Sequence, residues 1–222
     1  MKDKTRTILS WLPLAFGIAF GALALSLHHI ACENIIPSVY IQVPLYALVP
    51  AVFPLLEKFA KIKVPAFLVI VMTVQIIISV DFGTALNFYA FIPHYDKFLH
   101  AFFGLWCGQL AYYFIHVWGG GGMHAFGKAV FTLLAVLGVA ALWEVSEYCM
   151  SLVFGTDPQL WKGVLTDPSY HPLRDTMWDI IVAIIGCAVF FVSLAADRLC
   201  GGRLYRGTLS PVKGEGEKGQ TL

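Results

Sequence analysis

Three apolar stretches of the sequence each carry a pair of side chains that could do chemistry. The pairs are Asp96 with His100, Glu144 with Glu147, and Asp175 with Asp179. Residues three or four apart in a helix lie on one face, about 6 Å from one another. Carboxylates and imidazoles hold protons and bind cations. All six residues are therefore candidate catalytic residues, provided that the helices that carry them meet.

The composition decides which solvent surrounds these helices. Hydrophobic residues make up 58% of the chain and charged residues 13%, whereas soluble domains average roughly 45–50% and about 25%. The sequence therefore predicts an integral membrane protein. The formal net charge is +1, and the basic residues do not gather with aromatic ones, which indicates no nucleic-acid partner. The scattered cysteines show no metal-ligand spacing, and a Cys32–Cys149 disulfide stays open.

Six apolar runs are long enough to cross the hydrocarbon core of a bilayer, which takes about 20 helical residues. They cover residues 8–27, 39–56, 64–80, 98–117, 126–148 and 176–196. The first is longer than the core of a signal peptide, so we expect it to stay uncleaved. The second contains Pro44, Pro50 and Pro54 and is expected to be kinked or partly irregular. We expect an all-α protein, a bundle of about six transmembrane helices in a single polytopic domain, 1–206, with a disordered cytoplasmic tail, 207–222.

The distribution of lysine and arginine predicts the orientation. With both termini in the cytoplasm, the outer loops hold only Lys97, Lys162 and Arg174. The cytoplasmic segments then hold the other twelve basic residues, Lys2, Lys4, Arg6, Lys58, Lys61, Lys63, Lys128, Arg198, Arg203, Arg206, Lys213 and Lys218. This asymmetry follows the positive-inside rule.

In this orientation the three polar pairs all belong to the outer leaflet. At about 1.5 Å per helical residue, they form two layers, the second about 5–6 Å below the first. Asp81 ends the third apolar run on the same side and is a further candidate for the upper layer. The upper layer holds Asp96, Glu147 and Asp175, and the lower one holds His100, Glu144 and Asp179. We expect a pocket that opens to the outer face.

The charges of this pocket predict what it could bind. Its five acidic residues and one histidine face only Lys97 and Arg174, each about 100° round the helix from its neighbouring aspartate. Crowded carboxylates in a medium of low dielectric share protons or hold a cation. We therefore expect protons, a divalent metal ion or a cationic ligand group, with His100, Glu144 and Asp179 as candidate metal ligands. Lys97 and Arg174 are candidate substrate-binding residues that could receive a phosphate or a carboxylate.

Some of the same residues could have a structural role instead of a chemical one. Asp96 and Asp175 each follow a proline and open a helix, so both could be N-caps or partners of the helix dipole. The lower layer could be an interhelical hydrogen-bond cluster without chemistry.

Three motifs resemble those of the YjdF-type bacterial inner membrane protein family, within a wider VanZ-like group. They are D-K-F-L-H from Asp96, W-E-V-S-E-Y from Trp143, and D-T-M-W-D-I-I-V-A-I-I-G from Asp175. The residues that match are Asp96, Lys97, His100, Glu144, Glu147, Asp175, Thr176, Asp179 and Gly186, the last as a close-packing position. Two positions depart from the pattern: Arg174 replaces an aromatic residue, and residues 181–184 lack the asparagine of VanZ-like proteins. The resemblance implies a multi-pass fold in the cell inner membrane, and it brings no reaction with it.

Three functional classes fit these observations. The first is an enzyme that acts on the head group of a lipid or lipid-linked substrate, assisted by a metal or by acid–base chemistry. The second is a proton- or cation-coupled transporter of small molecules, and the third is a structural membrane protein. Deeper in the spans the main polar residues are Gln42, Gln75 and Gln109. The scarcity of polar residues there indicates no polar path across the membrane. It therefore favours a site reached from one face of the membrane, as in an enzyme.

Overall fold

The computed structural model describes residues 10–31, 36–159, 162, 171–205 and 209. Within these residues the protein is all-helical, and six helical segments are long and apolar enough to cross a membrane. The first three are α2 (Leu12–Ala31), the segment α3 (Val39–Ala47), η1 (Val49–Ala51) and α4 (Val52–Ala60), and the segment α5 (Ala66–Ile76) and η2 (Ile77–Ala85). The others are α7 (Tyr95–Val117), α8 (Ala125–Phe154) and α9 (Pro172–Leu199), and α6 (Phe88–Phe91) and η3 (Gly120–Gly122) are short connections.

The helices depart from the predicted runs mainly at their ends. α8 continues through the mostly apolar residues 149–154 to Phe154. α9 begins at Pro172, because its first turn, which contains Arg174 and Asp175, is helical as well. The second span has the expected irregularity: a 3-10 turn separates α3 from α4, and Pro44 lies inside α3. Of the expected tail 207–222, the structure describes only Leu209, which packs against Tyr112 and Phe190.

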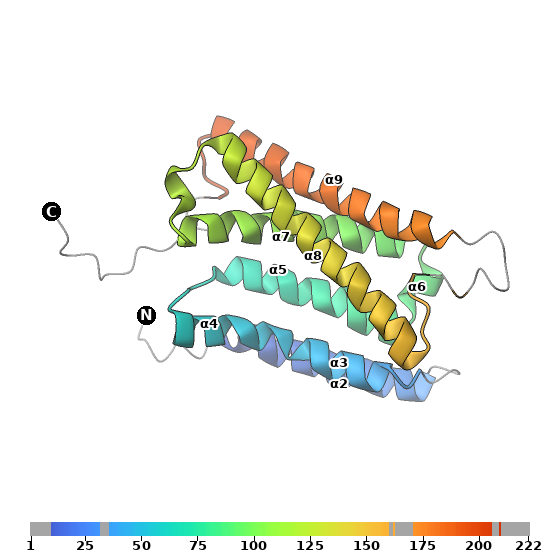
Figure 1. The fold of residues 1–222 in the computed structure, drawn as a ribbon. Coiled ribbons are helices and arrows are strands. Elements are labelled where there is room, and N and C mark those ends of the chain that lie inside the picture. Colours follow the sequence, from blue (N-terminus) through green and yellow to red (C-terminus); the bar gives the residue numbers. More distant parts are fainter. Residues whose placement is uncertain (1–9, 32–35, 160–161, 163–170, 206–208, 210–222) are drawn as a thin grey trace.

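The six spans form two groups (Figure 1). One group contains α7, α8 and α9, and the other contains α2, α3 and η2, with α5 in contact with both α2 and α7. The described chain starts and finishes at the same end of the bundle. The opposite end, where α7 and α9 begin, is the site end. Large apolar side chains such as Phe16, Phe67 and Phe131 are exposed on the outside, as expected where lipid replaces water.

Two glycines let α7 and α9 approach until their backbones touch. A Cβ atom on Gly104 would lie 1.9 Å from the carbonyl oxygen of Ala183, and one on Gly186 would lie 1.9 Å from that of Ala101. Such small residues are typical of close helix packing in membranes. Both helices begin at the site end, so this parallel contact brings the first turns of α7 and α9 together.

The third span changes its helix type near the site end. Its last nine residues, Ile77–Ala85, form a π-helix, a rare conformation that is frequent at functional sites. Asp81 in this segment is buried, with its carboxylate directed toward Gly21 of α2. His28 links the ends of α2 and η2, because its Nδ1 lies 2.8 Å from the Ala85 carbonyl oxygen.

Candidate functional site

Lys97 lies at the centre of three aspartates at the site end. Its Nζ atom donates to Asp96 Oδ2 at 2.9 Å, to Asp175 Oδ1 at 2.6 Å and to Asp179 Oδ1 at 2.7 Å. A lysine ammonium has three N–H donors, so these carboxylates use them all. Sequence spacing placed Lys97 about 100° away from the aspartate face, but its long flexible stem folds back across that angle.

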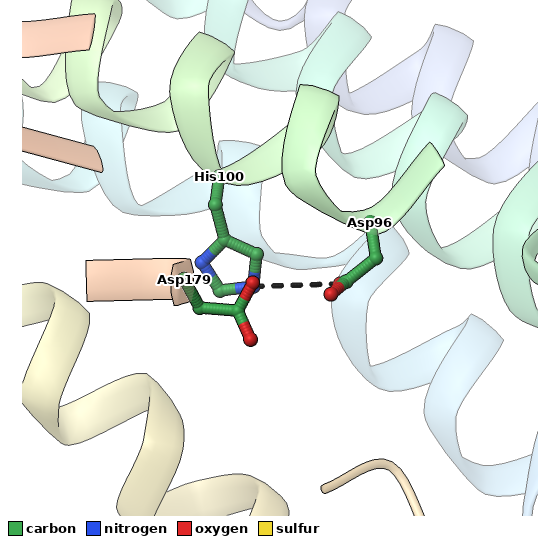
Figure 2. A group of neighbouring side chains, drawn as sticks. All are labelled: Asp96, His100 and Asp179. Atoms are coloured by element: carbon green, nitrogen blue, oxygen red, sulfur yellow. Dashed lines mark ion pairs between the residues drawn. The ribbon is translucent and has the colours of Figure 1, made fainter. Parts of the chain in front are cut away.

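His100 lies one turn below Asp96 and between two carboxylates (Figure 2). Its Nε2 atom is 3.5 Å from Asp96 Oδ1 and 3.7 Å from Asp179 Oδ1. His100 is 7% exposed and Asp179 is 2% exposed, so bulk water competes little with these contacts. The distances exceed those of a direct hydrogen bond and leave room for contacts to tighten around a bound molecule.

Asp96, His100 and Asp179 could together hold a metal ion. One ligand atom from each lies within 4.8 Å of the others, and an imidazole with two carboxylates suits Zn²⁺, Fe²⁺ or Mn²⁺. However, Lys97 Nζ already lies 2.7 Å from the same Asp179 oxygen, and a dication beside an ammonium is repelled. The residues fit a metal only if Lys97 releases Asp179, so the arrangement favours proton transfer over metal binding.

The two glutamates do not belong to this group of three, although Glu147 lines the same cavity as Asp96. Glu147 accepts a 2.8 Å hydrogen bond from Trp143 Nε1. Glu144 is buried and accepts from Gln159 Nε2, at 3.0 Å to its Oε2 and 2.9 Å to its carbonyl oxygen. The sequence suggested His100, Glu144 and Asp179 as metal ligands. Among the described residues, the group that could hold a metal contains Asp96 instead of Glu144. No periodicity connects Gln159 with Glu144, because Gln159 follows the end of α8.

The N-cap interpretation of Asp96 and Asp175 is wrong. His94 and His171 occupy the N-cap positions of α7 and α9, and both aspartates lie one or more residues inside the first turn. There they still interact favourably with the helix dipole.

Arg174 is exposed and does not line the cavity that lies against the first turn of α7. Cys149 is also exposed, and Cys32 lies outside the described residues, so their pairing stays a prediction.

A polar cavity of about 570 Å³ lies at the site end, against the first turn of α7. Its charged lining residues are Asp96, Lys97, Glu147, Asp157 and Asp175, and the rest of the wall includes both aromatic and uncharged polar side chains. A deep cavity of about 220 Å³ is lined mainly by apolar residues of α5, α7 and α8, together with His100. The two cavities share wall residues, namely Tyr46, Ser79, Tyr89, Asp96 and Trp143. Asp96 therefore lies where a polar space meets an apolar one, and His100 lines the apolar one.

Tyr89 of the connection α6 adds a proton donor to this wall. The residue is 40% exposed overall. Burial of its hydroxyl end, together with the negative charge of Asp96, holds the pKa of Tyr89 well above its ordinary value. The hydroxyl therefore keeps its proton at neutral pH. Sequence reasoning did not select this residue, because α6 lies between two spans and carries no acidic pair.

Comparison with known proteins places the chain in a family. A family model described as "Predicted membrane protein (DUF2238)" matches residues 12–198. No curated protein and no solved structure matches the chain. The matched residues run from the first turn of α2 to the last turn of α9. The whole helical bundle falls within the match, and the chain belongs to the DUF2238 family of predicted membrane proteins.

Proposed function

We propose that this protein is a YjdF-type enzyme of a bacterial inner membrane that acts on the head group of a lipid or lipid-linked substrate. One observation carries the proposal: Asp96 lines both a polar cavity at the site end and a deep apolar cavity, and His100 lines the deep cavity one helical turn away. A lipid has the same division, with a polar head group and an apolar chain. Its reactive bonds, between the two parts, would lie beside these side chains.

The chemistry that fits this site is acid–base catalysis. His100 would accept a proton from a water molecule or a substrate hydroxyl, and Asp96 and Asp179 would stabilise the resulting imidazolium from 3.5 and 3.7 Å. Lys97 holds Asp179 and Asp96 in position through its ammonium group. If a divalent metal displaced Lys97, the same three ligands would let it polarise the substrate. The reaction class is hydrolysis or transfer of the head group.

The shape of the cavities favours an enzyme over a transporter. A coupled transporter needs polar groups along a path to the other side of the membrane. Below His100, the deep cavity is bordered mainly by apolar side chains, including Phe103, Met72 and Val139. This wall suits an acyl or prenyl chain better than an ion.

The experiment is a lipid-conversion assay in vesicles made from a total polar lipid extract. The purified protein is reconstituted, and mass spectrometry follows the head-group classes over time, with and without added divalent metal. We expect one class to decrease, at a rate that His100→Gln lowers by at least about 100-fold. His116→Gln is the matched control, because His116 lies on α7 at the opposite end and bonds to the Tyr112 carbonyl oxygen.

Two outcomes would overturn the proposal. One is that wild-type protein leaves every lipid class unchanged under all conditions. The other is that wild type and His100→Gln convert lipid equally fast. Dissipation of a proton or cation gradient by vesicles that convert no lipid would replace the enzyme with the transporter.

A further inference from the structure

We infer that the head group recognised in the polar cavity carries a positively charged amine. This inference rests on the proposed function, because it names the substrate class of the same site. Three features of the cavity wall support it. The N–H donors of its lysine are all in use, its acceptors are carboxylates, and aromatic rings lie beside them.

The lysine at this site has no hydrogen-bond donor left for an anionic head group. All three N–H donors of Lys97 point to aspartates, at 2.6 to 2.9 Å. A phosphate could bind Lys97 only by displacing one of these carboxylates, which would then lie close to the phosphate with no counter-ion. The wall of the polar cavity therefore disfavours direct binding of a phosphate at Lys97.

Acceptors, by contrast, are abundant in the wall of the polar cavity. Asp96, Glu147 and Asp175 all line the polar cavity. In the deep cavity below it, Gln75 uses its Nε2 to donate to the Leu99 carbonyl oxygen at 3.3 Å. Its Oε1 atom is buried and has no partner among the described residues, although it belongs to the wall of the deep cavity. A buried acceptor without a partner is costly, and an N–H group of a bound amine would satisfy it if the head group extended into the deep cavity.

Four aromatic rings also line the polar cavity. Tyr46 and Trp143 lie 5.9 Å apart between ring centroids, and Tyr89 and Tyr95 lie 5.4 Å apart. All four line the polar cavity. Aromatic faces next to carboxylates are the usual environment in which proteins bind organic ammonium groups. Trp143 also donates to Glu147 at 2.8 Å, which fixes a carboxylate beside its ring.

The test compares two lysolipids with the same acyl chain. Lysophosphatidylethanolamine carries an ammonium group, and lysophosphatidylglycerol carries none. Binding of each to the purified protein in detergent is measured by native mass spectrometry. We expect wild type to bind the ethanolamine lipid at least about tenfold more tightly. Glu147→Gln should remove most of this preference. Tyr46→Leu, which removes a ring but no charge, should reduce it by about threefold.

Glu57→Gln is the control, because Glu57 lies on α4, away from the site end, and pairs with Lys63 at 3.6 Å. The Glu57→Gln variant should keep the wild-type preference for the ethanolamine lipid. Equal or tighter binding of the glycerol lipid would overturn the inference, as would a preference that both site variants retain. If the preference is absent while His100→Gln still stops lipid conversion, the amine inference fails and the proposed function stands. If neither lysolipid binds and no lipid is converted, both fail.

Discussion

At the scale of single residues, Lys97 explains how so many acids can share one membrane site. Three aspartates within reach of one another would repel strongly in a medium of low dielectric. The Lys97 ammonium lies within 2.9 Å of all three and compensates part of their charge. The cluster remains net negative, so a proton or a further cation is still favoured.

Removing this ammonium should create a metal site. In Lys97→Met the carboxylates of Asp96 and Asp179 lose their shared counter-ion, and His100 stays next to both. We expect Lys97→Met to bind about one divalent ion per protein, at least about tenfold more tightly than wild type. Isothermal titration with Mn²⁺ or Zn²⁺ measures this, and Lys63→Met, which breaks a surface pair with Glu57, is the control. Equally tight metal binding by wild type would contradict the view that Lys97 takes the metal's place.

The sequence could predict that the acids of the first turns of α7 and α9 meet but not how they pair, and it added Glu144 to the candidate metal ligands in place of Asp96. The i, i+4 spacing of Asp96 with His100 and of Asp175 with Asp179 follows from helix geometry alone. The position of Lys97 Nζ depends on the torsions of a long side chain, which no periodicity fixes. For the same reason the sequence suggested phosphate binding by Lys97, whereas the structure shows its donors in use by carboxylates.

At the scale of elements, the contact between α7 and α9 positions the site. Gly104 and Gly186 each lie against a backbone carbonyl of the other helix, and the first turns of these helices carry the aspartates. The family resemblance marked Gly186 as a close-packing position, and the structure agrees. Gly104 stood in no acidic motif, so nothing in the sequence distinguished it from other glycines.

A methyl group at Gly104 should therefore separate the two helices. The added Cβ would lie 1.9 Å from the Ala183 carbonyl oxygen, a contact that only a backbone shift relieves. We expect Gly104→Ala to destabilise the protein by about 1–3 kcal/mol and to slow lipid conversion by pulling Lys97 from Asp179. Thermal unfolding in detergent measures the first effect. Gly138→Ala is the control: nothing lies within 4 Å of a Cβ there, so it should be neutral or stabilising. Equal melting temperatures for both variants would contradict this role of the helix contact.

The spans themselves were predictable because lipid imposes a length and a composition on them. The π-helix at Ile77–Ala85 could not be predicted, since the composition of this apolar segment is equally typical of an α-helix. Gln159 was also missed: it lies beyond α8 and reaches Glu144 through folding of the chain, which local sequence does not encode.

At the scale of the whole molecule, the orientation in the membrane stays a prediction. The described chain starts and finishes at one end of the bundle, and the described segments expected on the cytoplasmic side carry six basic residues, Lys58, Lys61, Lys63, Lys128, Arg198 and Arg203. We expect this end to face the cytoplasm. A reporter that is active only in the cytoplasm should be active when fused after Leu222 and silent when fused after Gly155, which follows α8 at the site end. The opposite pattern from well-expressed fusions would contradict the predicted orientation.

The central claim is that the cluster around Asp179 does chemistry and does not merely hold helices together. Asp179→Asn tests it most directly, because asparagine keeps the shape and hydrogen-bonding capacity of the side chain and removes the charge. Lys97 would retain Asp96 and Asp175 as partners. Asp81→Asn is the matched control, since Asp81 is a buried carboxylate directed toward α2.

The measurement is the rate of lipid conversion in vesicles, taken beside thermal unfolding of the same preparations. Interhelical hydrogen bonds in membranes average only about 0.6 kcal/mol, so we predict that Asp179→Asn unfolds within a few degrees of wild type. We also predict that it loses at least about 100-fold in rate, while Asp81→Asn stays active. A folded Asp179→Asn protein that converts lipid at the wild-type rate would contradict the account.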